Sequence, residues 1–140
     1  MKTANQWVFT IVTAALLAFA SANADARGAD IRDIENMPVP AGLSLQDVSS
    51  SIVAGAANRG WTALEIAPGH IEATLYIRSH MAKVDIKFDT KTYNITYADS
   101  DNLKFDAVKY KIHKNYNSWV QNMSSDIRAE LARAQRLANR

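Results

Sequence analysis

The chain has 140 residues, no cysteine and a formal net charge of +2. The absence of cysteine excludes a disulfide framework, a thiolate metal site and a cysteine nucleophile. The near balance of charge argues against a partner such as nucleic acid or an anionic membrane.

The first 24 residues have the pattern of a secretory signal peptide. Lys2 supplies a positive start, residues 7–20 form an uncharged apolar run, and Ala22 and Ala24 make an Ala-x-Ala cleavage site. The run is shorter than the ~20 apolar residues that span a bilayer. We therefore expect cleavage after Ala24 and no stable membrane insertion afterwards, with an uncleaved anchor as the alternative. Because no cysteine is available to carry a lipid, the sequence predicts an unlipidated periplasmic protein.

Residues 25–43 show no sustained hydrophobic period. They combine charged residues, glycines and the prolines Pro38 and Pro40, which favours a flexible lead-in segment. Ile31 and Ile34 are its candidates for contact with the rest of the chain. Residues 44–138 are predicted to form a single α+β domain.

A first helix is predicted to begin after Ser44. Ser44 and Asp47 have the spacing of a capping box, and Gly60 is placed to end the helix. Apolar residues recur at helical spacing between them, and polar residues occupy the opposite side. The apolar set is Leu45, Val48, Ile52, Val53 and Ala56, and the polar set is Gln46, Ser49, Ser50 and Asn58.

Four short segments with alternating apolar and polar residues follow, at 61–67, 70–79, 82–89 and 92–97. Such segments, joined by tight turns, predict a four-stranded antiparallel meander with one apolar and one wet face. The residues expected on the apolar face of the last three are Ile71, Ala73, Leu75, Ile77, Val84, Ile86, Phe88, Tyr93, Ile95 and Tyr97. The wet face is expected to carry Glu72, Tyr76, Arg78, Lys83, Asp85 and Lys87.

Residues 99–111 allow two interpretations, a short fifth strand or a loop packed by its own apolar residues. A long final helix follows, with one apolar sector along it. That sector comprises Ile112, Tyr116, Trp119, Val120, Met123, Ile127, Leu131 and Ala134. Packing both helices on the apolar face of the sheet gives a two-layer α+β sandwich of order α-β-β-β-β-α.

Polar and aromatic residues gather in region 99–117 and its flank. The candidate ligand-binding residues are Asp99, Asp101, Asn102, His113, Asn115, Asn117 and Trp119. The structural interpretation is a turn at 99–102 and aromatic residues at the border of the core. The alternative is a groove beside the start of the helix that binds a sugar or a peptide.

Motifs for catalysis and metal binding are absent from the sequence. There is no Gly-x-Ser-x-Gly elbow, glycine-rich phosphate loop or HExxH motif, and the spacing of His70, His80 and His113 does not suit a shared ion. The acidic run at 99–102 lacks the central glycine and late glutamate of a calcium loop. We therefore predict no catalytic residue, no metal and no cofactor.

The sequence also resembles a family of small exported proteins of Gram-negative bacteria. The matching stretches are Arg59-Gly60-Trp61, then 68–86, 93–103 and 112–120, and the likeness covers about residues 45–131. Several members of that family have a lipobox cysteine, which this chain lacks. The resemblance implies export and a shared fold, and it supplies no catalytic residue.

Two functional hypotheses follow. The first is a non-enzymatic periplasmic module that binds another envelope component, a protein or a glycan, through the wet sheet face or the 99–117 region. The second is a module that binds a small ligand, or is weakly catalytic, at 99–117.

Overall fold

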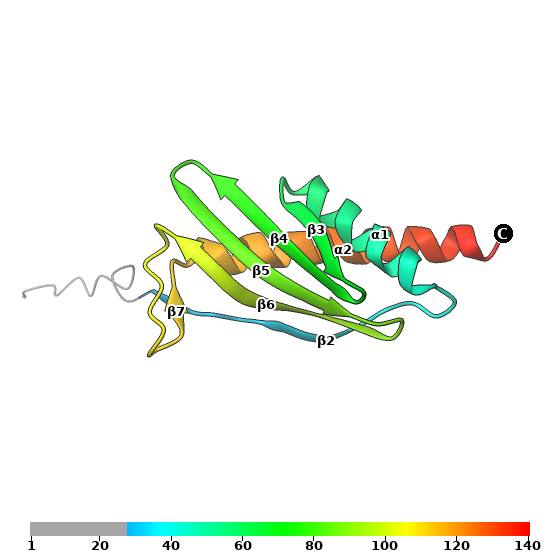
Figure 1. The fold of residues 1–140 in the computed structure, drawn as a ribbon, viewed down its shortest axis with the longest axis horizontal. Helices are drawn as coiled ribbons and strands as arrows, with labels where there is room; N and C mark the ends of the chain where they lie inside the picture. The colour runs from blue at the N-terminus through cyan, green and yellow to red at the C-terminus, as the bar shows by residue number, and fades with distance from the viewer. Residues whose placement is uncertain (1–27) are drawn as a thin grey trace, which may run out of the picture.

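The computed structural model describes residues 28–140 (Figure 1). The predicted signal peptide, with Ala22 and Ala24, lies outside the described residues. The elements in chain order are β1 (Ala29–Asp30), β2 (Ile34–Pro38), α1 (Leu45–Asn58), β3 (Thr62–Ala67), β4 (His70–Ile77), β5 (His80–Phe88), β6 (Thr92–Asp101), β7 (Lys111–Ile112) and α2 (Asn115–Ala138).

Both helices lie behind one antiparallel sheet in the view of Figure 1, so the predicted α+β architecture is confirmed. The main sheet has the strand order β2-β6-β5-β4-β3, and β1 pairs with β7 in a separate two-stranded sheet. The four predicted strands form its meander, but the prediction of a four-stranded sheet was wrong. A fifth strand, β2, precedes α1 in the chain.

That fifth strand lies within residues 25–43, which were predicted to be a flexible lead-in segment. For the described residues of this segment the prediction was wrong. β2 pairs antiparallel with β6, and Ile34 lies opposite Ile95. Four apolar side chains of the segment are buried, namely Ile31, Ile34, Val39 and Leu43. The strand escaped prediction because its register shifts between Ile34 and Met37, where Asn36 has a positive φ of 54°. The shift breaks the period of two that identifies a strand in a sequence.

Helix α1 begins with the predicted capping box. The Asp47 amide donates to Ser44 Oγ at 3.1 Å, and the Ser44 amide donates to Asp47 Oδ2 at 3.0 Å. Gly60 takes the left-handed conformation expected after a helix, with φ of 79°. Two assignments to faces were wrong. Leu45 is exposed, and Ser49 is buried because its hydroxyl donates to Glu65 Oε2 on β3 at 2.8 Å.

The core lies between the helices and one face of the sheet. The apolar residues predicted to face inward on β4 and β5 are buried, except for half-buried Ile77, and so are Tyr93 and Ile95 on β6. The Tyr93 hydroxyl reaches across the layers to Ser124 Oγ of α2 at 2.9 Å. This hydrogen bond satisfies two polar groups that would otherwise be buried at a cost.

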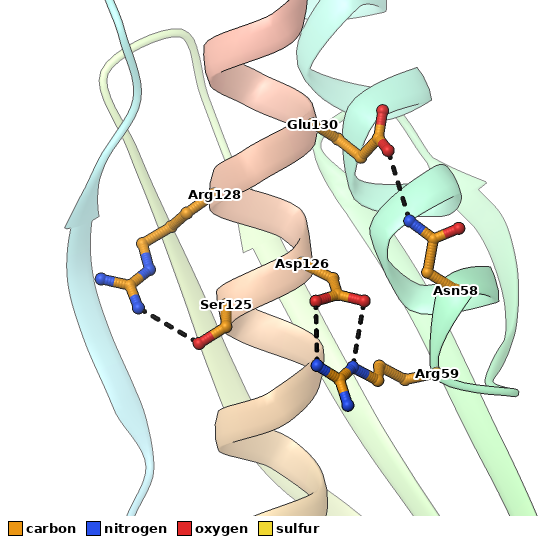
Figure 2. A network of polar contacts seen from close by, with 6 residues as sticks. All are labelled: Asn58, Arg59, Ser125, Asp126, Arg128 and Glu130. Carbon is orange, nitrogen blue, oxygen red and sulfur yellow. Dashed lines mark hydrogen bonds and ion pairs between the residues drawn. The ribbon is translucent and has the colours of Figure 1, made fainter.

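The two helices touch at Gly55 of α1. A Cβ atom at this position would lie 2.5 Å from the Cα of Ile127 in α2, so only glycine fits. The Arg59 side chain makes a two-pronged ion pair with Asp126, at 3.0 and 3.2 Å (Figure 2). Asn58 Nδ2 donates to Glu130 Oε1 at 3.3 Å beside it, so polar contacts fix the alignment of helices whose spacing Gly55 sets.

Several strand ends differ from the prediction. β4 ends at Ile77, and Arg78, expected on the wet face, lies in the β4–β5 turn with φ of 56°. β6 continues to Asp101, because Met81 of β5 supplies a partner for that residue. Asp99 and Asp101 are therefore strand residues, while Asn102 begins the turn.

The final helix starts later than its apolar pattern indicated. Ile112 belongs to β7, where it pairs with Ala29, and α2 begins at Asn115. Ile112 is nevertheless fully buried, which explains why it fits the apolar sector of a helix that does not include it. Within residues 28–140, no helix combines the length and the apolar character needed to cross a membrane.

Gly55→Ala is expected to lower the free energy of unfolding by about 1–3 kcal/mol, the usual cost of overpacking. The added methyl group must push α2 away from α1, which outweighs the gain in helix propensity of about 1 kcal/mol. Urea denaturation followed by circular dichroism measures the change. Ala57→Ser also adds one heavy atom, at an exposed site of the same helix, and should change stability by less than about 0.5 kcal/mol. Equal effects of the two substitutions would contradict the tight helix contact.

Candidate functional site

Three of the seven predicted ligand-binding residues gather around His80 at the start of β5. We call this group of His80, Asn102, His113 and Trp119 the histidine cluster. The His80 and His113 rings stack with their centroids 6.2 Å apart, and the Trp119 ring lies 6.3 Å from His80. The two imidazoles and the indole are partly exposed, so the cluster is open to solvent.

Backbone contacts hold the cluster in place. His80 Nδ1 lies 2.7 Å from the carbonyl oxygen of Asn102, and the Asn102 side-chain amide donates to Ser79 Oγ at 3.0 Å. The His113 amide donates to the Leu103 carbonyl at 2.8 Å. The β4–β5 turn, the end of β6 and the segment before α2 are thereby joined at one end of the sheet.

These contacts fix the tautomers of the neutral imidazoles. A carbonyl oxygen only accepts, so His80 Nδ1 carries the proton and Nε2 is left as an acceptor. His113 Nδ1 accepts from the Asn115 amide at 3.3 Å, so its Nε2 carries the proton and can donate. The neutral pair therefore offers one acceptor and one donor beside an aromatic ring.

The other four candidate residues have different surroundings. Asn115 takes part only through the amide just described, and Asp99 and Asp101 lie on β6 opposite Lys83 and Met81. Asn117 binds the chain before β2, since its side chain donates to the Asp30 carbonyl at 2.8 Å and accepts from the Arg32 amide at 3.0 Å. Its position explains how the N-terminal segment is tied to α2.

Region 99–111 is largely a loop packed by its own aromatic residues, the second of the two interpretations. Phe105 stacks on Tyr97 with centroids 4.2 Å apart, and the Tyr110 and Tyr116 rings meet Tyr97 edge-on. Asp33 ties this cluster to the N-terminal segment. Its carboxylate accepts from the Tyr97 amide and from the Tyr110 hydroxyl, both at 3.0 Å.

The second candidate surface is the outer face of the sheet, which the helices leave uncovered. Lys83 Nζ lies 3.2 Å from Glu72 Oε1, and His70 Nε2 lies 2.7 Å from Asp85 Oδ1. The hydrogen bond to Glu72 and the charge of Glu72 raise the pKa of Lys83. A shallow open pocket of about 390 Å³ adjoins His70, lined in part by the outward side chains of the strands.

His80 is the member of the histidine cluster that was not predicted as a ligand residue. A signal for it existed, because the turn that follows Phe88 places residues 80 and 102 at the same end of the β5–β6 hairpin. Among residues 28–140, no group of three or more histidine, aspartate or glutamate side chains is arranged to hold a metal ion. The histidine cluster offers hydrogen-bonding groups and aromatic rings.

Comparisons of the chain with protein-family models, with curated proteins and with solved structures gave no match.

Stability is expected to fall between pH 10 and about 12, in part through Tyr110. Burial raises the pKa of Tyr110 to about 12 from an ordinary value of 10.0, and Asp33 adds to this effect through its hydrogen bond and its negative charge. A pKa raised by folding gives stability that is complete below pH 10 and is lost as the folded-state group titrates. Urea denaturation at several pH values should show a shallower decline for Tyr110→Phe than for the wild type.

Asp33→Asn provides an independent check on the same pH dependence. It removes a negative charge that disfavours the Tyr110 phenolate, so it too should make the decline shallower. Slopes identical to the wild type for both variants would show that the Asp33–Tyr110 contact is not formed.

Proposed function

We propose that this chain is a non-enzymatic binding module of the bacterial cell envelope, exported to the periplasm, whose partner protein docks on the outer face of the sheet. The observation that carries the proposal is that the described helices cover one face only. Export is supported by the signal-peptide pattern of the first 24 residues.

The outer face exposes large apolar side chains among polar ones. Tyr76 is 76% exposed, and Leu64 and Ile66 on β3 are 62% and 54% exposed. Tyrosine is enriched at protein interfaces because it supplies a large contact area together with a polar end. Exposed residues of this kind on a rigid sheet give a partner anchoring points at little cost in conformational entropy.

Some of the charged residues of this face are paired with one another. Lys83 and Glu72 form an ion pair on neighbouring strands, and the His70 ring lies within hydrogen-bond distance of the Asp85 carboxylate. An ion pair that is partly open to solvent, such as Glu72–Lys83, contributes little to stability. The arrangement of these residues instead favours a partner selected by shape and apolar contact over one attracted by charge.

A photo-reactive amino acid placed at Tyr76 tests the proposal in intact cells. We expect a discrete covalent adduct with an envelope protein, identified by mass spectrometry after irradiation. Leu137 is the matched control, because it is also a large exposed residue, at 57%, but lies on α2 in the other layer. The same adduct from both positions, or none from Tyr76, would refute docking on the outer face.

A second candidate function is recognition of a small ligand by the histidine cluster. Its supporting observation is the acceptor and donor presented by the two imidazoles beside the Trp119 ring. N-acetylated sugars and peptides both carry amide groups that complement such a pair, and a sugar ring can stack on an indole. A glycan of the envelope is thus the ligand class that we propose to test first.

A thermal-shift titration with N-acetylated oligosaccharides tests this second function. A ligand that binds only the folded state raises the melting temperature, and at a hundred times Kd it contributes about 2.7 kcal/mol. His113→Ala should abolish the shift. Asn117→Ala is the control, because Asn117 lies four residues further along the chain but is hydrogen-bonded to Asp30 and Arg32, and the shift should persist. A shift that is insensitive to His113→Ala would exclude the cluster as its origin.

A further inference from the structure

The free edge of β3 is a second surface of the sheet available for binding. β3 pairs with β4 on one side, and it is the last strand of the five-stranded sheet (Figure 1). Within residues 28–140, Thr62–Ala67 makes no backbone hydrogen bond outside this ladder. Alternate N–H and C=O groups along the outer side of β3 are therefore open to another strand.

The opposite edge of the sheet is more obstructed than the edge of β3. β2 carries a register shift, the positive φ of Asn36 and a proline, Pro38, each of which obstructs pairing with a further strand. β3 has a register shift too, between Glu65 and Ala67, but it lies at the end of the strand and leaves Thr62 to Glu65 in regular register. β3 has neither proline nor lysine within it, and every one of its residues except Ala63 is exposed. Leu64 and Ile66 add apolar side chains to this open edge.

We propose that β3 pairs antiparallel with β3 of a second copy of this chain, with Leu64 of one copy opposite Leu64 of the other. Antiparallel pairing around a two-fold axis lets the same strand of each copy form the interface. In this register Thr62 lies opposite Ile66, so all five residues from Thr62 to Ile66 are paired.

Charge selects this register over its neighbour. Glu65 is the one charged residue in β3 and points to the helix side, where it accepts from Ser49. Centring the pair on Leu64 places Glu65 opposite Ala63, whereas centring it on Glu65 would set two like charges directly opposite, which is destabilising. Centred on Leu64, the pair places each Glu65 opposite an uncharged alanine.

Pairing of the two β3 strands joins two sheets into one and places their outer faces side by side. The contact is confined to one strand from each copy, so it is smaller than a standard protein interface and should give a weak, concentration-dependent dimer. The inference rests on the backbone edge of β3, and it stands or falls independently of the docking partner proposed for the outer face.

Single-cysteine variants test both the dimer and its register, because the chain has no cysteine of its own. Directly opposite residues in an antiparallel pair have Cα atoms about 4.5 or 5.5 Å apart, and a disulfide needs about 4.4–6.8 Å. Leu64→Cys should therefore form a covalent dimer under mild oxidation, read on a non-reducing gel.

Ile66→Cys is the matched control, on the same strand and similarly exposed. The Ile66 residues of the two copies would lie four residues apart along the paired strands, about 13 Å. This variant should therefore cross-link at least about tenfold more slowly than Leu64→Cys. A mixture of Thr62→Cys and Ile66→Cys chains should form the heterodimer. Circular dichroism of each reduced variant confirms that the fold is retained.

Equal cross-linking of Leu64→Cys and Ile66→Cys, or none in either, would overturn the proposal. So would a wild-type chain that sediments as a monomer at every concentration up to that of the cross-linking assay. An adduct captured from Tyr76 together with an unreactive Leu64→Cys would reject the β3 dimer and leave the docking face standing.

Discussion

The close approach of α1 and α2 at Gly55 is the constraint on which the rest of the structure depends. With Ile127 against the backbone of Gly55, the two helices lie side by side in one layer. Together they cover the apolar face of the sheet, where Ile71, Val84 and Ile86 are fully buried. A chain without disulfides depends on such a core, because the area removed from water is its main source of stability. Both described helices pack on this face of the sheet, and the other face is not covered by a helix.

The N-terminal segment supplies the edge strand of the sheet that lies opposite β3. β2 extends the sheet beyond β6. Asp33, just before β2, accepts a hydrogen bond from Tyr97 of the aromatic cluster, and Asn117 of α2 donates to the Asp30 carbonyl. The end of the sheet that carries the histidine cluster is thus held by contacts from four separate parts of the chain. A site at this end is preorganised, since its side chains do not depend on a single mobile loop.

The proposed binding surfaces differ in chemistry. The outer face combines exposed apolar residues with paired charges, the edge of β3 offers backbone hydrogen bonds, and the histidine cluster offers ring nitrogens beside an indole. A protein partner, a second copy and a small amide-bearing ligand are the respective occupants that we propose for them. None of these surfaces overlaps the buried helix contact, so substitutions on them can change binding without unfolding the protein.

Local patterns in the sequence determined the elements with a regular period and clear end signals. The capping box of Ser44 and Asp47, the alternation in β4 and β5, and the apolar sector of α2 after Tyr116 depend on neighbours in the chain, so the sequence was sufficient for them. Asn102, His113 and Trp119 could likewise be selected as candidates from their residue types. Tertiary structure alone decided the pairing of β2, because its bulge removes the period. It also decided the burial of Ser49, which needs Glu65 as a partner, and the meeting of His80 with His113. These features depend on contacts between residues distant in sequence, and no local pattern specifies such contacts.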